Sequence, residues 1–191
     1  SIPLGIWTAR REGGVLDRSL TVINQIFMSV PPFLLGVACT YIFGVGLRIF
    51  VPGQFVSYTQ SWPKFLVYPI FPAISIAISR IAMTVKMLRA SILNQMERDY
   101  VRTARSRGST KDRILKKHVL RNAIIPVITF IATSMAEIVA SSIVIEQVFA
   151  IPGIGVLLLS SINNRDFPVV QALVMILVLW VVLVNFLADL L

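Results

Sequence analysis

The stretch that decides the fold is FPVVQALVMILVLWVVLVNFLA, residues 167–188, which is 22 residues long and carries no charge. A helix needs about 20 apolar residues to cross the hydrocarbon core of a bilayer. This stretch therefore predicts a membrane-spanning helix. The chain as a whole agrees, because 56% of its 191 residues are hydrophobic and only 14% are charged. That composition excludes a disordered tail and a soluble basic nucleic-acid binder.

Three more apolar runs predict three further spans, at residues 19–47, 65–85 and 122–145. The second and third qualify only if Arg80 and Glu137 face protein, water or the membrane interface. The predicted fold is all-α and polytopic. Prolines inside the runs predict kinked helices, at Pro31, Pro32, Pro69, Pro72 and Pro126.

The positive charge is concentrated in residues 86–121, which hold 11 of the 18 Lys and Arg residues but only three acids. Cytoplasmic loops of membrane proteins carry the excess of Lys and Arg. We therefore expect residues 86–121 on the cytoplasmic side, together with residues 10–18. Residues 48–64 and 151–166 are then expected outside.

Helical periodicity divides this basic segment in two. Apolar residues recur on one face at Leu93, Met96, Tyr100, Val101 and Ala104. Gly108 is expected to end that helix, with Ser109 as the N-cap of a second one. Apolar positions of the second helix are Ile114, Leu115 and Val119. The alternative from the pattern alone is a basic loop that lies on anionic lipid headgroups.

Two blocks of sequence carry a resemblance to a known family. The stretch DYVRTARSRG (99–108), followed by HVLRN (118–122) and Pro126, resembles the EAA loop of permease subunits of ATP-binding-cassette importers. It is more narrowly similar to the dipeptide, oligopeptide and nickel permease group. The loop's usual Glu is replaced here by Arg102, as in that group. The stretches EQVF (146–149), PGIG (152–155) and NRDFP (164–168) resemble the external loop of the same group.

The resemblance covers essentially the whole chain and implies a type I importer transmembrane domain over residues 1–191. The family has six spans, so we expect this domain to be incomplete at its N-terminus. Residues 94–121 would form a coupling segment that docks on an ATPase subunit, with Tyr100 as an anchor and Ala104 permitting close approach. The implied coupling residues are Asp99, Tyr100, Arg102, Thr103, Ala104, Arg107, Gly108, His118, Arg121 and Asn122.

The resemblance also implies the partners and the location. These partners are a second related permease subunit, two cytoplasmic ATPase subunits, an external or periplasmic solute-binding protein and membrane lipid, without nucleic acid. The expected location is the cell membrane, crossed several times. No phosphate-binding loop or catalytic arrangement occurs in the sequence, so we expect no cofactor, no catalytic residue and ATP hydrolysis on other subunits.

Two acids lie in or near the third span. Glu137 and Glu146 are nine residues apart and would lie on opposite faces of a continuous helix. For Glu137 the translocation path and helix packing remain equally open. Glu146 is expected to anchor an external loop together with Pro152 and Gly153. Arg165 and Asp166 are expected to cap the last span or to contact a delivery protein.

The sequence contains too few His and Cys residues to predict a metal site from them. The chain has one His, His118, and one Cys, Cys39, so we expect no metal site and no intrachain disulfide.

Three other functions stay open beside a peptide importer. One is an importer of nickel or another small solute from the same group. The second is a proton-coupled secondary transporter that uses Glu137. The third is a membrane scaffold that presents a basic surface without transporting anything.

Overall fold

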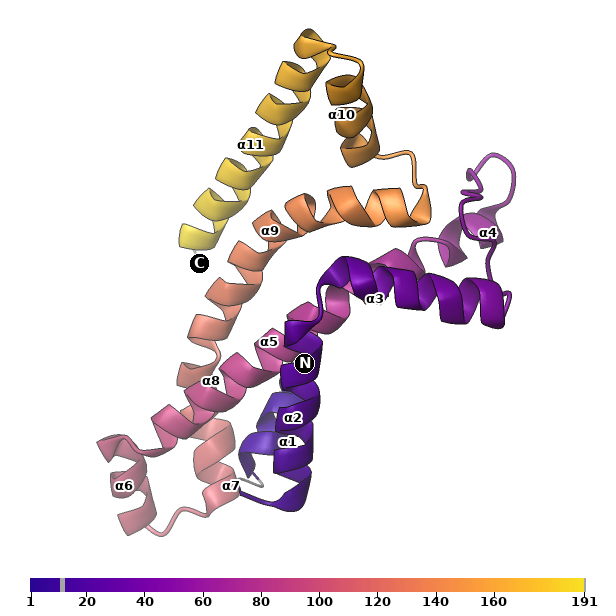
Figure 1. Ribbon diagram of the computed structural model, residues 1–191. Helices are drawn as coiled ribbons and strands as arrows, with labels where there is room; N and C mark the ends of the chain where they lie inside the picture. The colour runs from indigo at the N-terminus through magenta and orange to yellow at the C-terminus, as the bar shows by residue number, and fades with distance from the viewer. Residues whose placement is uncertain (11–12, 191) are drawn as a thin grey trace. The chain divides into compact units, whose positions relative to one another are not determined.

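Helices make up most of the computed structural model, which describes residues 1–10 and 13–190 (Figure 1). No strand occurs in this described part, so the all-α prediction is confirmed there. The α-helices are α1 (Ile2–Arg10), α2 (Val15–Ser29), α3 (Pro32–Cys39), α4 (Trp62–Val67), α5 (Ile70–Met96), α6 (Asp99–Ser106), α7 (Lys111–Ile114), α8 (Leu120–Ala123), α9 (Ile125–Phe149), α10 (Ile154–Asn163) and α11 (Phe167–Asp189). Two π-helical stretches are η1 (Thr40–Gly46) and η2 (Leu115–Val119).

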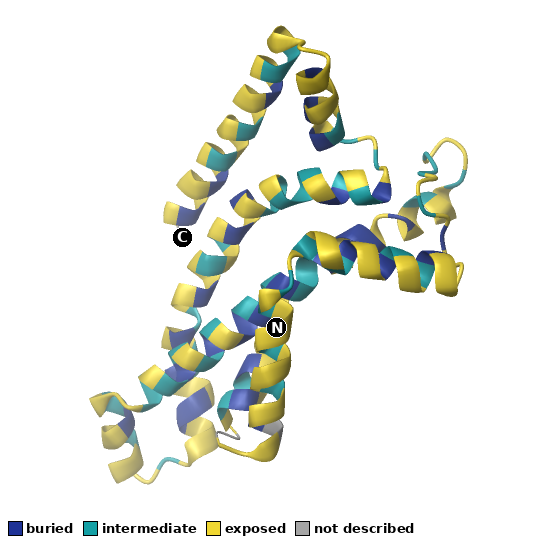
Figure 2. Ribbon diagram, viewed as in Figure 1, coloured by how far each residue is buried: buried dark blue, intermediate teal, exposed yellow. Residues whose placement is uncertain are grey.

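Three helical segments are long and apolar enough to cross a membrane. They are Trp62–Met96, formed by α4 and α5, then α9 and α11. They correspond to the predicted spans at 65–85, 122–145 and 167–188. A third of the apolar window of the first segment (33%) is buried, including Phe71 and Leu88. In α11 only 11% of the apolar window is buried. Figure 2 shows α11 as mostly exposed, as expected of a helix that faces lipid or a partner.

The predicted kink in the span at residues 19–47 is a complete break between two helices. Helix α2 ends at Ser29 and α3 begins at Pro32, so the two form at most one broken span. Pro31 has extended backbone angles, with φ −58° and ψ 141°. The ring of a proline disfavours the helical conformation of the residue before it, so the Pro31–Pro32 pair ends one helix and starts the next.

The other prolines act at helix starts rather than as mid-helix kinks. Tyr68 and Pro69 form a turn between α4 and α5, and Pro72 lies in the first turn of α5. Pro126 is the second residue of α9. The first turn of a helix tolerates proline because its N–H groups have no intrahelical acceptor there.

The chain divides into two compact units, and the first consists of residues 1–29 and 80–132. Its apolar core joins residues from α5, α6, α7, η2, α8 and α9, namely Leu88, Ile92, Val101, Ile114, Leu115, Val119, Ala123 and Val127. Helix α1 approaches this core closely at Gly5, where an added Cβ would lie 2.8 Å from the Leu88 side chain. The basic segment is therefore built into a folded body and is not a free loop.

The second unit consists of residues 30–79 and 133–190. Its core is aromatic, with the rings of Phe50 and Phe71 stacked at 4.5 Å between centroids. The Tyr68 hydroxyl donates a hydrogen bond to the carbonyl oxygen of Phe149. Cys39 is buried in the same core, in the role of a small apolar residue.

Candidate functional site

Helix α6 has two different faces. Val101 is completely buried in the core of the first unit, and Tyr100 and Ala104 pack against that core. Arg102, Thr103, Arg105 and Ser106 are exposed. The buried face thus fixes α6 on the core of the first unit, and its basic side chains remain exposed.

The end of α6 is set by Gly108. This residue has φ +79°, a conformation that glycine adopts without steric cost. The Gly108 N–H donates to the Arg105 carbonyl at 2.9 Å, and the Ser109 N–H donates to the Ala104 carbonyl at 3.2 Å. These two bonds form a Schellman motif, which satisfies the last carbonyls of the helix and turns the chain sharply.

The periodicity of residues 93–104 comes from two helices and not from one. Helix α5 ends at Met96, and Arg98 is extended, with φ −70° and ψ 152°, before α6 begins at Asp99. Ile92 of α5 and Val101 of α6 lie in the same core. The apolar pattern therefore continues across the break because both helices pack on one core.

The predicted cap of the second helix is also corrected. The Thr110 hydroxyl, and not that of Ser109, accepts a hydrogen bond from the Arg113 N–H, at 3.4 Å. Ser109 is occupied in the turn that ends α6, so the next residue becomes the N-cap. The predicted apolar positions Ile114, Leu115 and Val119 are all buried.

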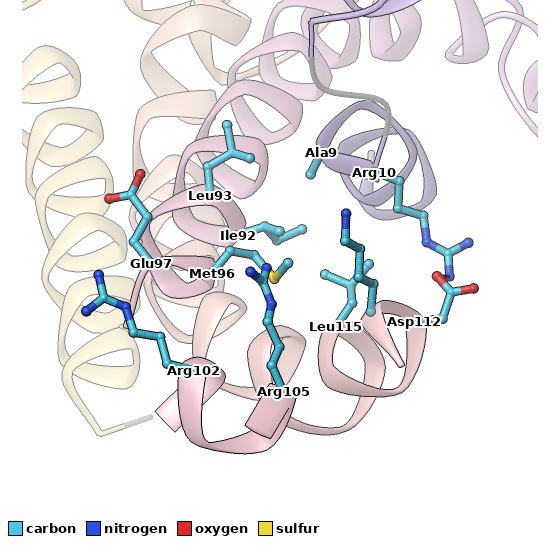
Figure 3. A pocket seen from close by; sticks show the side chains of 11 residues that line it. Ala9, Arg10, Ile92, Leu93, Met96, Glu97, Arg102, Arg105, Asp112 and Leu115 are labelled. Atoms are coloured by element: carbon cyan, nitrogen blue, oxygen red, sulfur yellow. Dashed lines mark hydrogen bonds and ion pairs between the residues drawn. The ribbon is translucent and has the colours of Figure 1, made fainter. Parts of the chain in front are cut away.

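A cavity of about 970 Å³ lies beside α6 in the first unit (Figure 3). Its basic residues are Arg10, Arg102, Arg105 and Lys111, and its acids are Glu97 and Asp112. Ile92, Leu93, Met96 and Leu115 form its apolar part. Figure 3 shows Arg105 extending from α6 towards Met96. The hollow is thus net basic and has room for side chains of another protein.

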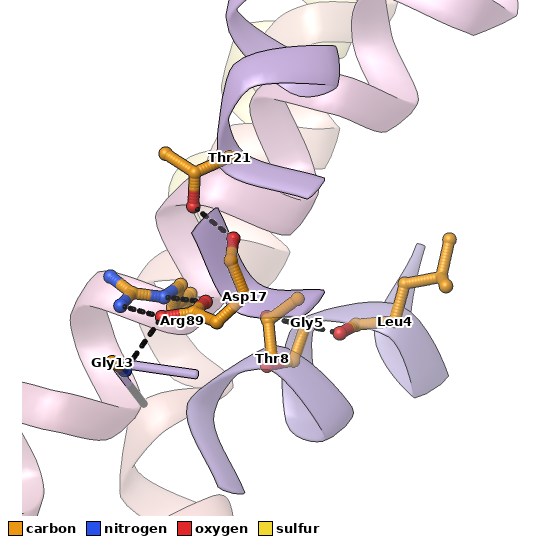
Figure 4. Close-up of polar contacts among 7 residues, drawn as sticks. All are labelled: Leu4, Gly5, Thr8, Gly13, Asp17, Thr21 and Arg89. Atoms are coloured by element: carbon orange, nitrogen blue, oxygen red, sulfur yellow. Dashed lines mark hydrogen bonds and ion pairs between the residues drawn. The ribbon is translucent and has the colours of Figure 1, made fainter. Parts of the chain in front are cut away.

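Two ion pairs attach the N-terminal helices to this body. Arg10 of α1 contacts Asp112 of α7 at 2.7 Å. The Arg89 guanidinium of α5 donates two hydrogen bonds to the Asp17 carboxylate of α2, at 3.0 and 2.8 Å (Figure 4). The Gly13 N–H donates a third, at 3.1 Å. Sequence reasoning missed the Asp17–Arg89 pair. Its only signal was a lone acid at the edge of the uncharged run that starts at residue 19.

The structure places the expected coupling residues in two groups. Tyr100 and Ala104, expected to contact a partner, face the chain's own core, and the Tyr100 hydroxyl donates to Gln95 at 2.8 Å. The reason is that Val101, Tyr100 and Ala104 share the face that α6 needs for its own packing. The exposed residues are Asp99, Arg102, Thr103, Arg107, Gly108, His118, Arg121 and Asn122.

Glu146 in the second unit caps a neighbouring helix. Its carboxylate accepts hydrogen bonds from the N–H groups of Gly155, at 2.7 Å, and Val156, at 3.2 Å. These groups lie in the first turn of α10, where a negative charge is favourable. A side chain at Gly153 would collide with this carboxylate. Pro152 is exposed in the same corner.

The corner before α11 has a similar construction. Arg165 has φ +56°, and the Asp166 side chain accepts a hydrogen bond from the Val169 N–H at 3.4 Å. Asp166 is therefore the N-cap of α11.

Glu137 is exposed on α9. It lies one turn along the helix from Ala140, which lines an apolar groove of about 260 Å³ together with residues of α11. The described residues contain no group of three or more His, Cys, Asp or Glu side chains that could hold a metal ion.

Apolar spans together with a folded basic body define the chain as a polytopic membrane protein. A model of the family described as "Binding-protein-dependent transport system inner membrane component" matches residues 1–191. The chain belongs to this family.

Individual relatives agree with the family match. The chain is 33% identical to the probable peptide ABC transporter permease protein y4tP of Sinorhizobium fredii, over 99% of this chain and 60% of the relative. It is 33% identical to the dipeptide transport system permease protein DppB of Bacillus subtilis, over 98% of this chain and 58% of the relative. It is 34% identical to the oligopeptide transport system permease protein AppB of the same species, over 100% of this chain and 61% of the relative. The chain thus spans about 60% of the length of the curated relatives that it matches.

Proposed function

We propose that this chain is the main part of a permease subunit of an ATP-driven importer for dipeptides or oligopeptides. It would form the translocation path with a second, related permease. The three relatives, which are named as peptide, dipeptide and oligopeptide permeases, support the substrate class. The family description supports delivery of that substrate by a binding protein.

The observation that carries the proposal is the division of α6 into a buried and a basic face. Val101 is fully buried, whereas Arg102, Thr103 and Arg107 are exposed. The basic face would dock in an acidic groove of an ATPase subunit, and complementary charge would steer the docking. Because α6 is packed into the first unit, movement of the ATPase would be passed to the spans that leave this unit.

The ion pairs of the first unit support a cytoplasmic location for residues 86–121. Arg10 contacts Asp112, and Asp17 contacts Arg89, so the start of the chain lies on the same side as the basic segment. Both segments are rich in Lys and Arg, as the positive-inside rule requires of cytoplasmic segments. ATP hydrolysis would take place on the separate ATPase subunits.

The proposal is tested by reconstituting the complete permease with its second permease, its ATPases and the binding protein in liposomes. Arg102→Glu with Arg107→Glu should abolish peptide-stimulated ATP hydrolysis and peptide uptake, because two attractive contacts become repulsive. Arg18→Glu is the matched control, since Arg18 is an exposed cation of the same unit that lies on α2, outside the proposed coupling segment 94–121. Ala104→Glu would be a poorer test, because Ala104 packs against the core and its replacement perturbs folding.

Three outcomes would contradict the proposal. If the Arg102→Glu, Arg107→Glu variant kept full ATP-coupled transport, α6 would not be part of the ATPase interface. Uptake that continues without ATP but stops with the proton gradient would indicate a secondary transporter. Uptake of nickel but not of peptides would correct the substrate class.

A further inference from the structure

A second cavity, of about 410 Å³, lies in the second unit beside the start of α4. Aromatic and aliphatic side chains form most of its wall, including Phe50, Pro63, Val67 and Tyr68. Two cations, Arg48 and Lys64, also line it. No acid is among the lining residues. The cavity therefore combines an apolar wall with an uncompensated positive charge of two.

Neither cation is neutralised by a neighbour. Within residues 1–10 and 13–190, neither Arg48 nor Lys64 forms an ion pair. Arg48 also has φ +52°, a conformation that residues with a side chain rarely adopt. Backbone strain of this kind collects at ligand sites, where the surrounding structure holds it in place. Arg48 and Lys64 are thus available to an anion from outside the chain.

The surroundings of the cavity are those of a membrane surface. Helix α4 starts the apolar segment Trp62–Met96. Trp62 is 61% exposed, and its ring lies 5.9 Å from that of Tyr58 and 6.0 Å from that of Phe65. Trp and Tyr collect where membrane meets water. The large apolar side chains of Ile49 and Val51, both more than half exposed, border the same cavity.

We propose that this cavity binds the headgroup of an anionic phospholipid of the surrounding bilayer. The phosphate would lie between Arg48 and Lys64, and the glycerol with the first acyl carbons would cover Phe50, Pro63 and Val67. The charge favours an anion, and the apolar wall with its exposed apolar border favours an amphiphile over a soluble anion.

The test is lipid photolabelling of the complete permease complex in nanodiscs of phosphatidylcholine that contain a trace of photoactivatable phosphatidylglycerol. Peptide mapping should place the label within residues 48–68. Arg48→Gln and Lys64→Gln should each weaken labelling about fivefold, and the double variant about thirtyfold. Arg165→Gln is the matched control, an exposed cation outside the cavity, and should label like the unchanged protein. Arg48→Lys with Lys64→Arg keeps both charges and should retain labelling.

Three results would overturn the proposal. Equal labelling of the double-Gln and unchanged proteins would show that the cations bind no headgroup. Complete competition by soluble glycerol phosphate would reassign the cavity to a free anion. If docking of the solute-binding protein abolished labelling at every lipid concentration, the cavity would be a contact site for that protein and not a lipid site. Equal melting temperatures of all variants and the unchanged protein would exclude a folding defect as the cause of weaker labelling. The labelling experiment does not require the complex to transport peptide.

Discussion

Replacing Asp17 by Asn should destabilise the first unit, because it weakens a buried ion pair between α2 and α5. The Asp17 carboxylate is only 4% exposed and accepts three hydrogen bonds, two from Arg89 and one from Gly13. Breaking a buried pair by removing one partner costs about 3–5 kcal/mol, because the other charge stays behind. Arg89 is 27% exposed and regains some hydration, so we expect a loss just below this range, about 2–3 kcal/mol.

A double-mutant cycle measures this energy directly. The variants are Asp17→Asn, Arg89→Gln and the two together, each followed by thermal unfolding of the purified permease with circular dichroism. Each single variant should lower the melting temperature by roughly 5 °C or more, given about 2–4 °C per kcal/mol for a protein of this size. The double variant should cost about 2 kcal/mol less than the sum of the singles.

Arg18→Gln is the control for Asp17→Asn, because Arg18 is exposed on the neighbouring position of α2. It should change stability by no more than about 0.5 kcal/mol. If the two singles simply add in the double variant, the Asp17–Arg89 contact carries no energy of its own. The attachment of α2 to α5 would then have to come from apolar packing alone.

Three further changes can be checked by the same thermal unfolding. Gly155→Ala should destabilise by about 1–3 kcal/mol, because the new Cβ would lie 2.6 Å from the Ile143 Cα atom; an unchanged melting temperature would mean that the α9–α10 corner can open freely. Ala150→Gly should stabilise by about 1 kcal/mol, since Ala150 has φ +50°, and a destabilised variant would contradict this conformation. Asp166→Ala should cost about 1 kcal/mol through loss of the α11 cap, whereas Asp166→Asn should cost much less; equal losses would point to charge instead of capping.

Local signals in the sequence were enough for the features that depend on local chemistry. The uncharged run at 167–188 matches α11, because hydropathy over about 20 residues reports membrane crossing directly. Gly108 ends α6 because only a residue without a side chain takes that backbone conformation easily. The corner residues Glu146 and Asp166 were also singled out, although their hydrogen-bond partners were not.

The features that could not be predicted from the sequence depend on contacts between residues that are far apart in the chain. Periodicity identified the inner face of α6, but it does not say whether Tyr100 and Ala104 cover their own core or a partner. Asp17 and Arg89 are 72 residues apart, and no local pattern connects them. The break at Pro31 was expected as a kink, because a proline pair does not reveal from sequence alone how far a helix will bend.

The ion pairs that attach α1 and α2 to the rest of the first unit also have a consequence for the biogenesis of the protein. Asp112, the partner of Arg10, lies 102 residues later in the chain. During synthesis, Asp17 of α2 therefore lacks its partner Arg89 until α5 is made, and Arg10 of α1 lacks Asp112 until α7 is made. Contacts between such distant residues form late. In that interval the apolar sides of the first helices are open to chaperones and proteases. A chain that stops before residue 88 lacks Leu88, Arg89 and Asp112 and keeps these helices uncovered, which makes the unfinished product recognisable to the quality-control machinery of the cell.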